Sequence, residues 1–169
     1  HRWIYNNIRH FIGNRVMEIG GNVGHFTKFL LKKDLIISID ICDDCVELMK
    51  SLFLSTNIKI YKGDICEYKI VELAKSESID TIICINVLEH IEDDFKAIKH
   101  MYHILAQSKG TLILLVPALQ GLYGTLDKSA GHYRRYNLKE LNTKLDKAGF
   151  TIKKQIFMNS IGLIGWYLN

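Results

Sequence analysis

Two short stretches of this 169-residue chain carry side chains that could perform acid–base or binding chemistry. Glu89 and His90 follow an apolar run in INVLEHIEDD, while His132 and Arg135 lie in GHYRRY. A histidine can act as a general base near neutral pH, and a glutamate beside it can orient it or contact a substrate. Arg135 and its neighbour Arg134 could together clamp an anionic acceptor such as a phosphate or a carboxylate. A histidine that only bonds locally at a helix start and a solvated basic turn stay open as alternatives.

A glycine-rich turn comes much earlier, in EIGGNVG, which begins at Glu18. Glycines such as Gly20 and Gly24 let a chain turn sharply and let its backbone approach a ligand closely. Glu18 could orient this turn or accept a hydrogen bond from the amino group of a ligand. Asp40 follows Gly20 by twenty residues. That is the spacing at which an acidic residue accepts the hydroxyls of a ribose, although Asp40 could also cap a helix.

The same turn separates two classes of nucleotide-binding protein. Nicotinamide-binding folds carry G-x-G-x-x-G, whereas Asn22 and His25 occupy the later glycine positions here. No pyrophosphate cradle is evident, which disfavours an NAD-dependent oxidoreductase but keeps it as an alternative. Asp64, in YKGDI, follows another predicted strand, where its carboxylate could accept a hydrogen bond from an adenine amine.

Alternating strands and helices would have to position these residues. Short β-branched runs predict strands at 16–19, 35–39, 58–61, 79–85, 111–116 and 152–157. Amphipathic stretches predict helices at 2–12, 26–33, 46–53, 95–105 and 138–148, the last one capped by Asn137 and ended by Gly149. This alternation predicts an α/β fold with a doubly wound, mainly parallel sheet and helices on both faces. Ligands bind such sheets at the carboxyl ends of the strands, where the polar residues above lie.

The stretches EIGGNVG, ISIDIC, YKGDI and INVLEHIEDD, in this order and spacing, resemble the motifs of class I S-adenosylmethionine-dependent methyltransferases. The later VPALQGLYGTLDKSAGHYRRYNLKEL, with AGF and a final GWYLN, resembles a bacterial subfamily often found with glycosyltransferases. The resemblance implies a Rossmann-like sheet, S-adenosylmethionine as cofactor and S-adenosylhomocysteine as product. Asn22 replaces the glycine usual at its position, and because Asn tolerates left-handed backbone angles we expect an adapted loop rather than a lost site.

The resemblance also implies two sets of site residues. The cofactor set is Glu18, Gly20, Asn22, Gly24, Asp40, Ile41, Asp64, Ile65, Asn86 and Val87. The catalytic set is Glu89, His90, His132 and Arg135. Some methyltransferases that act on vicinal hydroxyls carry E-x-x-E-H after the fourth strand and bind a divalent ion there. Asn86 stands in place of the first glutamate, while Glu89, His90 and, as a further candidate, His132 remain. The loss of a hard carboxylate ligand leads us to expect no metal.

Composition narrows the partners and the setting. The net charge of +4 comes from scattered basic residues and not from a stripe, so we expect no nucleic-acid partner. Four cysteines without a signal peptide predict a reducing, cytoplasmic setting, and the CxxC of Cys42 and Cys45 lacks a second pair at zinc-site spacing. No apolar run is long enough for a transmembrane segment.

The length predicts one domain over 1–169. Members of the resembled subfamily continue beyond the GWYLN-like segment, which implies that this chain is truncated and lacks the final, antiparallel strand. One sheet edge would then be open, and the apolar segment 161–169 could pair with a second copy as a homodimer.

Three functions from different classes follow. The leading hypothesis is methyl transfer to a small-molecule, sugar-containing or lipid-linked acceptor, with the sugar suggested by the resemblance alone. A catalytically silent cofactor-binding module is the second, since the loop carries a substitution. An NAD-dependent oxidoreductase is the third.

Overall fold

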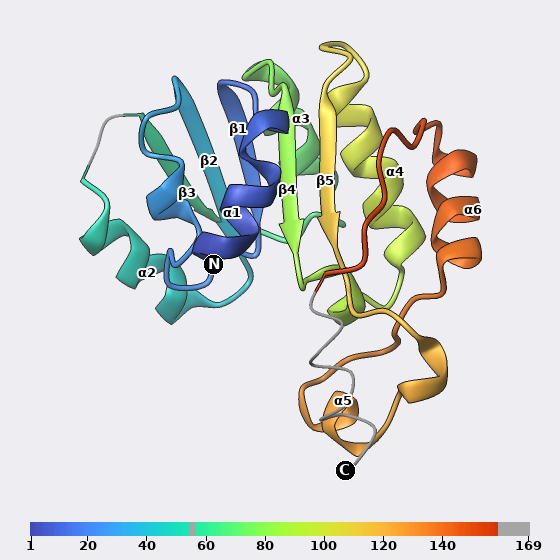
Figure 1. The fold of residues 1–169 in the computed structure, drawn as a ribbon. Coiled ribbons are helices and arrows are strands. Elements are labelled where there is room, and N and C mark those ends of the chain that lie inside the picture. Colours follow the sequence, from blue (N-terminus) through green and yellow to red (C-terminus); the bar gives the residue numbers. More distant parts are fainter. Residues whose placement is uncertain (55–56, 159–169) are drawn as a thin grey trace.

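A computed structural model describes residues 1–54 and 57–158 of the chain. Within them, five parallel strands form one sheet in the order β3-β2-β1-β4-β5 (Figure 1). The strands are β1 (Arg15–Ile19), β2 (Leu35–Asp40), β3 (Ile58–Lys62), β4 (Thr81–Ile85) and β5 (Thr111–Leu115). The chain builds outward from β1 to β3 and then returns to place β4 on the other side of β1. The predicted α/β class with a parallel, doubly wound sheet is confirmed, and the order reverses between β1 and β4.

Helices cover both faces because successive strand residues point to opposite sides. They are α1 (Arg2–Ile8), α2 (Asp43–Leu52), α3 (Tyr68–Ser76), α4 (Asp94–Leu105), α5 (Thr125–Ser129) and α6 (Leu138–Ala148). Met17 packs in the larger core cluster together with residues of α3, α4 and α6. Its neighbour Val16 packs in the smaller cluster, with residues of α1 and with Phe26 and Leu30. These two apolar layers hold the strand ends, and so the polar residues that follow them, in place.

The predicted ends of α6 are confirmed, but the predicted cap is not: Asn137 makes no side-chain capping bond, and its Oδ1 accepts the N–H of Gln120 at 3.3 Å. The α6 helix begins after Asn137 and ends at Gly149, whose φ of 105° is the left-handed conformation typical of a helix stop. The Sγ atom of Cys42 accepts a hydrogen bond from the backbone N–H of Cys45 at the start of α2. A hydrogen bond to Cys42 and partial desolvation raise the pKa of the Cys45 thiol to about 11. A protonated thiol is unsuited to redox chemistry, which agrees with a structural role for this CxxC.

Two predicted elements are wrong. The helix expected at 26–33 is only a 3-10 turn, Thr27–Phe29, because the side chain of Thr27 is pulled into the core and bonds to Glu18. The strand expected at 152–157 is absent, and Ile152, Ile156 and Phe157 are exposed along an irregular segment. Alternating apolar residues form a strand only where a neighbouring edge accepts their hydrogen bonds. Helices α3 and α5 were not predicted, and the apolar segment 161–169 lies outside the described residues.

A long excursion, the 117–137 loop, leaves the sheet after β5 and returns to α6. Its base is closed by two backbone hydrogen bonds, from Tyr136 N to Pro117 O (2.9 Å) and from Leu119 N to Tyr136 O (3.0 Å). It contains a 3-10 turn, Gln120–Leu122, and the short α5, and it hangs below the sheet in Figure 1. The loop therefore extends the structure beyond the carboxyl ends of the strands. No helix of the described residues is long and apolar enough to cross a membrane.

Candidate active site

The glycine-rich turn after β1 lies directly against the turn after β4. Gly20 and Gly24 have φ values of 77° and 80°, and Asn22 has a φ of 48°, so the expected left-handed asparagine is present. A Cβ atom at Gly20 would lie 2.2 Å from Cγ2 of Val87. The backbone N–H groups of Gly20 and Gly21 both bond to Ile39 O at the end of β2. The turn is thus held by β2 and touches the β4 turn at the point where the strand order reverses.

Glu18 lies beneath this turn and is almost fully buried, with 3% of its surface exposed. Its Oε2 accepts hydrogen bonds from Thr27 Oγ1 (2.5 Å) and from Ser38 Oγ (3.0 Å). Burial raises the pKa of Glu18 to about 7 against the opposing effect of these two bonds. Of the two roles predicted for Glu18, the contacts in this structure serve the first, which is to brace the turn from below.

Asp40 ends β2 and ties two backbone segments together. One carboxylate oxygen accepts the N–H of Asn22 (2.7 Å), and the other accepts the N–H of Cys42 (2.9 Å). Each carboxylate oxygen has a second lone pair, so Asp40 can still accept from a ligand while it holds the turn. Ile41 beside it is 71% exposed, an apolar side chain left without a core to pack in. A planar apolar ligand surface could cover it.

Asp64 and Ile65 follow the carboxyl end of β3, the strand next to β2. The Oδ1 atom of Asp64 accepts the N–H of Cys66 at 2.8 Å, and its residue is half-buried. Ile65 is only 2% exposed and its carbonyl oxygen bonds to Nδ1 of His100. Its side chain belongs to the core, which leaves only its backbone N–H for a ligand contact.

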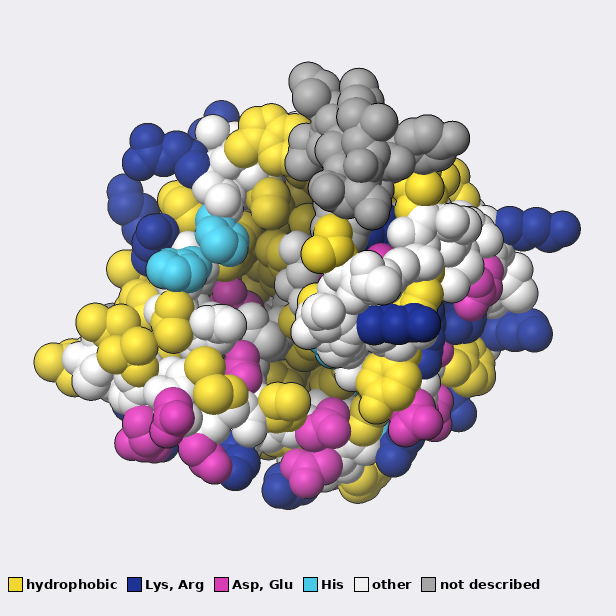
Figure 2. Space-filling view, turned by 90° about the horizontal axis from the view of Figure 1, so that it is seen from below, with side chains coloured by type: hydrophobic (Ala, Val, Ile, Leu, Met, Phe, Trp, Pro, Cys, Tyr) yellow, Lys and Arg dark blue, Asp and Glu magenta, His cyan; other side chains and the backbone are white. Residues whose placement is uncertain are grey.

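Asn86 and Val87 form the turn after β4. Asn86 is exposed in a left-handed conformation with a φ of 53°, and its N–H bonds to Leu115 O. Figure 2 looks onto this edge of the molecule from below and shows a hollow near the middle, with hydrophobic side chains inside it. The structure therefore gathers the predicted cofactor residues along one edge of the sheet, in a row from β3 to β4.

Glu89, His90 and His132 meet although they come from distant segments. The first two belong to the 3-10 turn Leu88–His90, and His132 lies in the 117–137 loop. Their candidate ligand atoms all lie within 4.8 Å of one another. The two imidazole rings are in edge-to-face contact, with 4.6 Å between ring centroids. Partial burial and the neighbouring His132 lower the pKa of His90, so its ring is neutral at pH 7.

Asp127 completes this cluster, and the sequence did not reveal it. Its buried carboxylate accepts hydrogen bonds from Nδ1 of His132 (3.0 Å), from Nε of Arg135 (2.8 Å) and from the N–H of Gly124 (3.0 Å). Burial by itself raises the pKa of Asp127, but these bonds outweigh it and hold the pKa below its ordinary value. The available signal was weak, an acidic residue five positions before a histidine in a long loop.

The arginine pair does not form the anion clamp expected from the sequence. Arg135 is 5% exposed and directs its guanidinium at Asp127. Arg134 bonds to the carbonyl oxygens of Ile91 and Glu92 and forms an ion pair with Asp94 at 3.1 Å. Both guanidinium groups are therefore used inside the protein: Arg134 fastens the 117–137 loop to the turn after β4, and Arg135 bonds to Asp127 within the loop.

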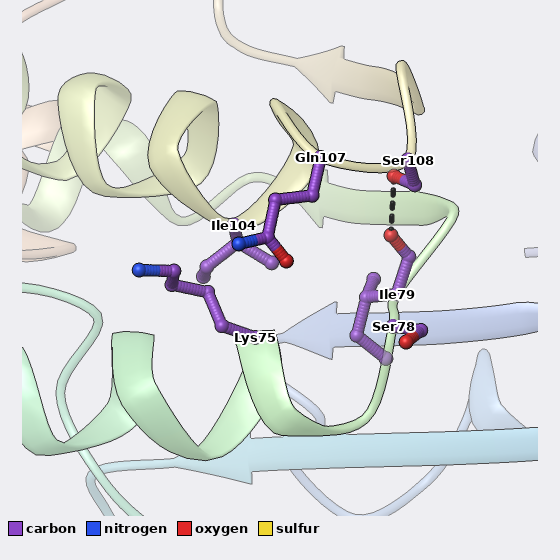
Figure 3. A pocket seen from close by; sticks show the side chains of 6 residues that line it. All are labelled: Lys75, Ser78, Ile79, Ile104, Gln107 and Ser108. Atoms are coloured by element: carbon purple, nitrogen blue, oxygen red, sulfur yellow. Dashed lines mark hydrogen bonds between the residues drawn. The ribbon is translucent and has the colours of Figure 1, made fainter.

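A separate pocket lies at the opposite edge of the sheet, between the ends of α3 and α4 (Figure 3). Its lining residues are Lys75, Ser78, Ile79, Ile104, Gln107 and Ser108. The hydroxyl of Ser108 donates to Ile79 O at 2.7 Å, the hydrogen bond drawn as a dashed line in Figure 3. This pocket lies at the amino ends of the strands, remote from the predicted site residues.

Comparisons with known proteins agree on the fold. The family model described as a methyltransferase domain matches residues 7–155. An S-adenosylmethionine-dependent methyltransferase from Mesorhizobium loti superposes with a TM-score of 0.71 at 12% identity, covering 95% of this chain and 87% of that one. No protein of curated function matches the chain by sequence.

Two further structures share the fold, and their names describe different proteins. The N-terminal domain of EvdMO1, solved with S-adenosylhomocysteine and D-fucose, has a TM-score of 0.61 and 16% identity over 88% of this chain and 70% of that one. The [4+2]-cyclase SpnF has a TM-score of 0.70 and 16% identity over 90% of this chain and 58% of that one. At such identities the likeness concerns the fold alone.

Proposed function

The chain belongs to the methyltransferase-domain family, and we propose that it methylates a hydroxyl group of a sugar-containing or lipid-linked small molecule. The observation that carries the proposal is the meeting of two features at one sheet edge. One is the glycine-rich turn, which contacts the turn after β4 through Gly20 and Val87. The other is the cluster of Glu89, His90 and His132, which begins two residues further along that same turn.

S-adenosylmethionine is the cofactor. When bound, it supplies a methyl group activated by a sulfonium. The residues present fit such a group: the left-handed turn at Gly20, Asn22 and Gly24 would cradle it, and Asp40 keeps free lone pairs for ribose hydroxyls. Exposed Ile41 would pack on an adenine ring, and Asp64 would accept from its amine. Asn86 and Val87 would flank the methionine part.

A hydroxyl acceptor needs a group that takes up its proton, and an imidazole of this cluster would supply it. Asp127 is ionised and accepts only, so Nδ1 of His132 carries the hydrogen of their bond. The lone pair of His132 is then on Nε2. In the metal-free site, we assign His132 as the general base, with His90 beside it and Arg135 as a positioning residue that holds Asp127.

The acceptor class rests on the surroundings of this cluster. Leu119, Leu126 and Tyr133 of the 117–137 loop are 40%, 49% and 52% exposed, an apolar and aromatic set suited to a sugar ring or a lipid chain. Among the structures of this fold, the N-terminal domain of EvdMO1 was solved with D-fucose. These observations favour a sugar-containing or lipid-linked acceptor over a macromolecular one.

Calorimetric titration with S-adenosylhomocysteine tests the cofactor site, with NAD titrated in parallel. Asp40→Ala should weaken S-adenosylhomocysteine binding by about 10–100-fold, the value of a charge-assisted hydrogen bond. Asp44→Ala, a neighbouring exposed residue at the start of α2, is the matched control and should bind as wild type does. Tighter binding of NAD than of S-adenosylhomocysteine would point to an oxidoreductase instead.

A labelling experiment tests the reaction. The chain is incubated with methyl-tritiated S-adenosylmethionine and, separately, free sugars, nucleotide sugars and lipid-linked saccharides. The proposal expects label in one of these classes and its loss in His132→Ala. Cofactor binding without label in any class would favour the silent module. Consumption of an acceptor without label would favour other chemistry on the same fold, as the name of SpnF illustrates.

A further inference from the structure

The cluster of Glu89, His90 and His132 has the donor set of an open metal site. Two imidazoles and one carboxylate come within 4.8 Å of one another across two segments of the chain. A backbone hydrogen bond holds these two segments together next to the ligand atoms: the N–H of Tyr133 donates to Glu89 O at 2.8 Å. Ligand atoms of a tetrahedral zinc ion lie about 3.4 Å apart, so the three side chains would move closer together when a cation binds.

Glu89 provides an independent observation that points to a ligand at this place. The residue is 1% exposed, and its Oε2 is the one buried side-chain oxygen or nitrogen of the described residues without a hydrogen-bond partner. A buried polar atom that is left unpaired costs about 1–3 kcal/mol, more when it is charged. A cation in contact with Oε2 would remove that cost.

The bond between His132 and Asp127 prepares the histidine for the same role. Metal-bound histidines commonly donate their second ring N–H to a carboxylate, which fixes the tautomer and makes the coordinating nitrogen more basic. Here Nδ1 of His132 lies 3.0 Å from Oδ1 of Asp127, and Arg135 holds that carboxylate from the other side. The outer support typical of a catalytic metal site is therefore already in place.

We propose that Glu89, His90 and His132 bind a first-row divalent transition-metal cation, with Zn²⁺ and Co²⁺ as suitable ions. Mixed imidazole and carboxylate donors suit these ions better than Mg²⁺ or Ca²⁺, which prefer oxygen ligands. Three protein ligands leave positions open, as in catalytic sites. What this means for catalysis rests on the proposed function. With a cation bound, the acceptor oxygen would contact the cation and would no longer contact the imidazole nitrogens directly. From the sequence we expected no metal because Asn86 replaces a carboxylate ligand, although Glu89, His90 and His132 remained as possible ligands; the structure brings these three together.

Titration of the chain with Co²⁺ alone, followed by visible absorption and calorimetry, tests the proposal. We expect a single Co²⁺ per chain with d–d bands and no thiolate charge-transfer band. Glu89→Gln and His132→Ala should each weaken binding by at least about tenfold, and Asp127→Asn by about 10–100-fold. Two control variants should bind as wild type does: His25→Ala, which breaks the separate His1–His25 ring contact, and Cys42→Ser, which removes one thiol of the CxxC.

The outcomes separate this proposal from the proposed function. Each variant is first shown to bind S-adenosylhomocysteine, so that loss of metal is not loss of fold. Equal Co²⁺ affinity in wild type and Glu89→Gln, or a thiolate band that disappears in Cys42→Ser, overturns the metal site and leaves methyl transfer untouched. Co²⁺ binding that depends on Glu89 and His132 upholds the site even if no acceptor is ever labelled.

Discussion

Nδ1 of His132 lies 3.0 Å from Oδ1 of Asp127, and the same oxygen accepts Nε of Arg135 at 2.8 Å. Three residues of the 117–137 loop are thereby joined through one buried carboxylate. Because the hydrogen bonds to Asp127 hold its pKa below the ordinary value against the effect of burial, the carboxylate is ionised at neutral pH. The tautomer of His132 follows from this charge, and so does the direction of its reactive lone pair.

Asp127→Asn should remove the preference of His132 for the tautomer that carries its hydrogen on Nδ1. An amide can donate to Nδ1 as well as accept from it, so the neutral ring of His132 becomes a mixture of both tautomers. Nitrogen-15 NMR of the imidazole reports the change directly, without need of an acceptor. Once an acceptor is identified, kcat in the metal-free protein should fall by up to about 100-fold, part of the contribution of a general base, with less change in KM.

Arg135→Gln is the matched control for this substitution. It breaks the same buried ion pair, at a cost of about 3 kcal/mol, but leaves the carboxylate in place beside His132. Its imidazole should keep the hydrogen on Nδ1. A wild-type tautomer in Asp127→Asn would show that the carboxylate does not orient the ring.

Gly20→Ala should destabilise the fold at the contact between β1 and β4. An alanine is strained at a φ of 77°, and its Cβ would lie 2.2 Å from Val87 Cγ2. The two effects together predict a loss of about 2–4 kcal/mol in urea unfolding. Gly121→Ala is the control, because a Cβ there meets no atom within 4 Å, and it should change stability by less than about 0.5 kcal/mol. Equal stability of the two variants would mean that the turn after β1 is not closely packed.

Glu18→Gln should change how stability depends on pH. Burial raises the pKa of Glu18 from 4.5 to about 7, so between these values the folded protein binds more protons than the unfolded chain. The contribution of Glu18 therefore falls as pH rises from 4.5 to 7 and is constant above that. The free energy of unfolding of the variant relative to wild type should rise by about 2–3 kcal/mol from pH 5 to pH 8.

Glu47→Gln serves as the control for that measurement, since Glu47 is an exposed residue paired with Lys50 on α2. Its stability relative to wild type, measured over the same pH range, gives the baseline for removing an exposed carboxylate. If Glu18→Gln behaves like Glu47→Gln, the carboxyl of Glu18 is hydrated in solution and does not brace the turn from a dry site.

Asp94→Asn should loosen the 117–137 loop. Asp94 is buried at the start of α4 and accepts from Tyr136 (2.8 Å), Lys144 (2.6 Å) and Arg134 (3.1 Å). Loss of its charge leaves two cations beside a neutral amide, at a cost of about 2–4 kcal/mol. Trypsin should then cleave after Arg134 sooner than in wild type. Glu92→Gln, an exposed neighbour, should leave both stability and cleavage unchanged, and equal cleavage of the two variants would count against the anchor.

Local sequence patterns were enough to predict the sheet and the turns that position the site. β-branched runs, a glycine-rich turn and an acidic residue twenty positions later predicted the parallel sheet, the turn at Gly20 and the placement of Asp40. These features are encoded within one or two elements, where propensity and spacing act directly. The same reasoning was wrong where tertiary contacts overrode propensity, as at Thr27, whose hydroxyl bonds to buried Glu18 and shortens a predicted helix to one turn.

By itself, the sequence determined the α/β class, the five strands of the sheet, and the strand ends that carry polar residues. Only the tertiary structure decided that His132 meets Glu89 and His90, that Asp127 holds His132, and that both arginines serve as internal anchors. The physical reason is that periodicity is a property of neighbours along the chain. The path of the 117–137 loop is set by buried ion pairs and hydrogen bonds to a turn more than twenty-five residues earlier, and these leave no regular mark in the sequence.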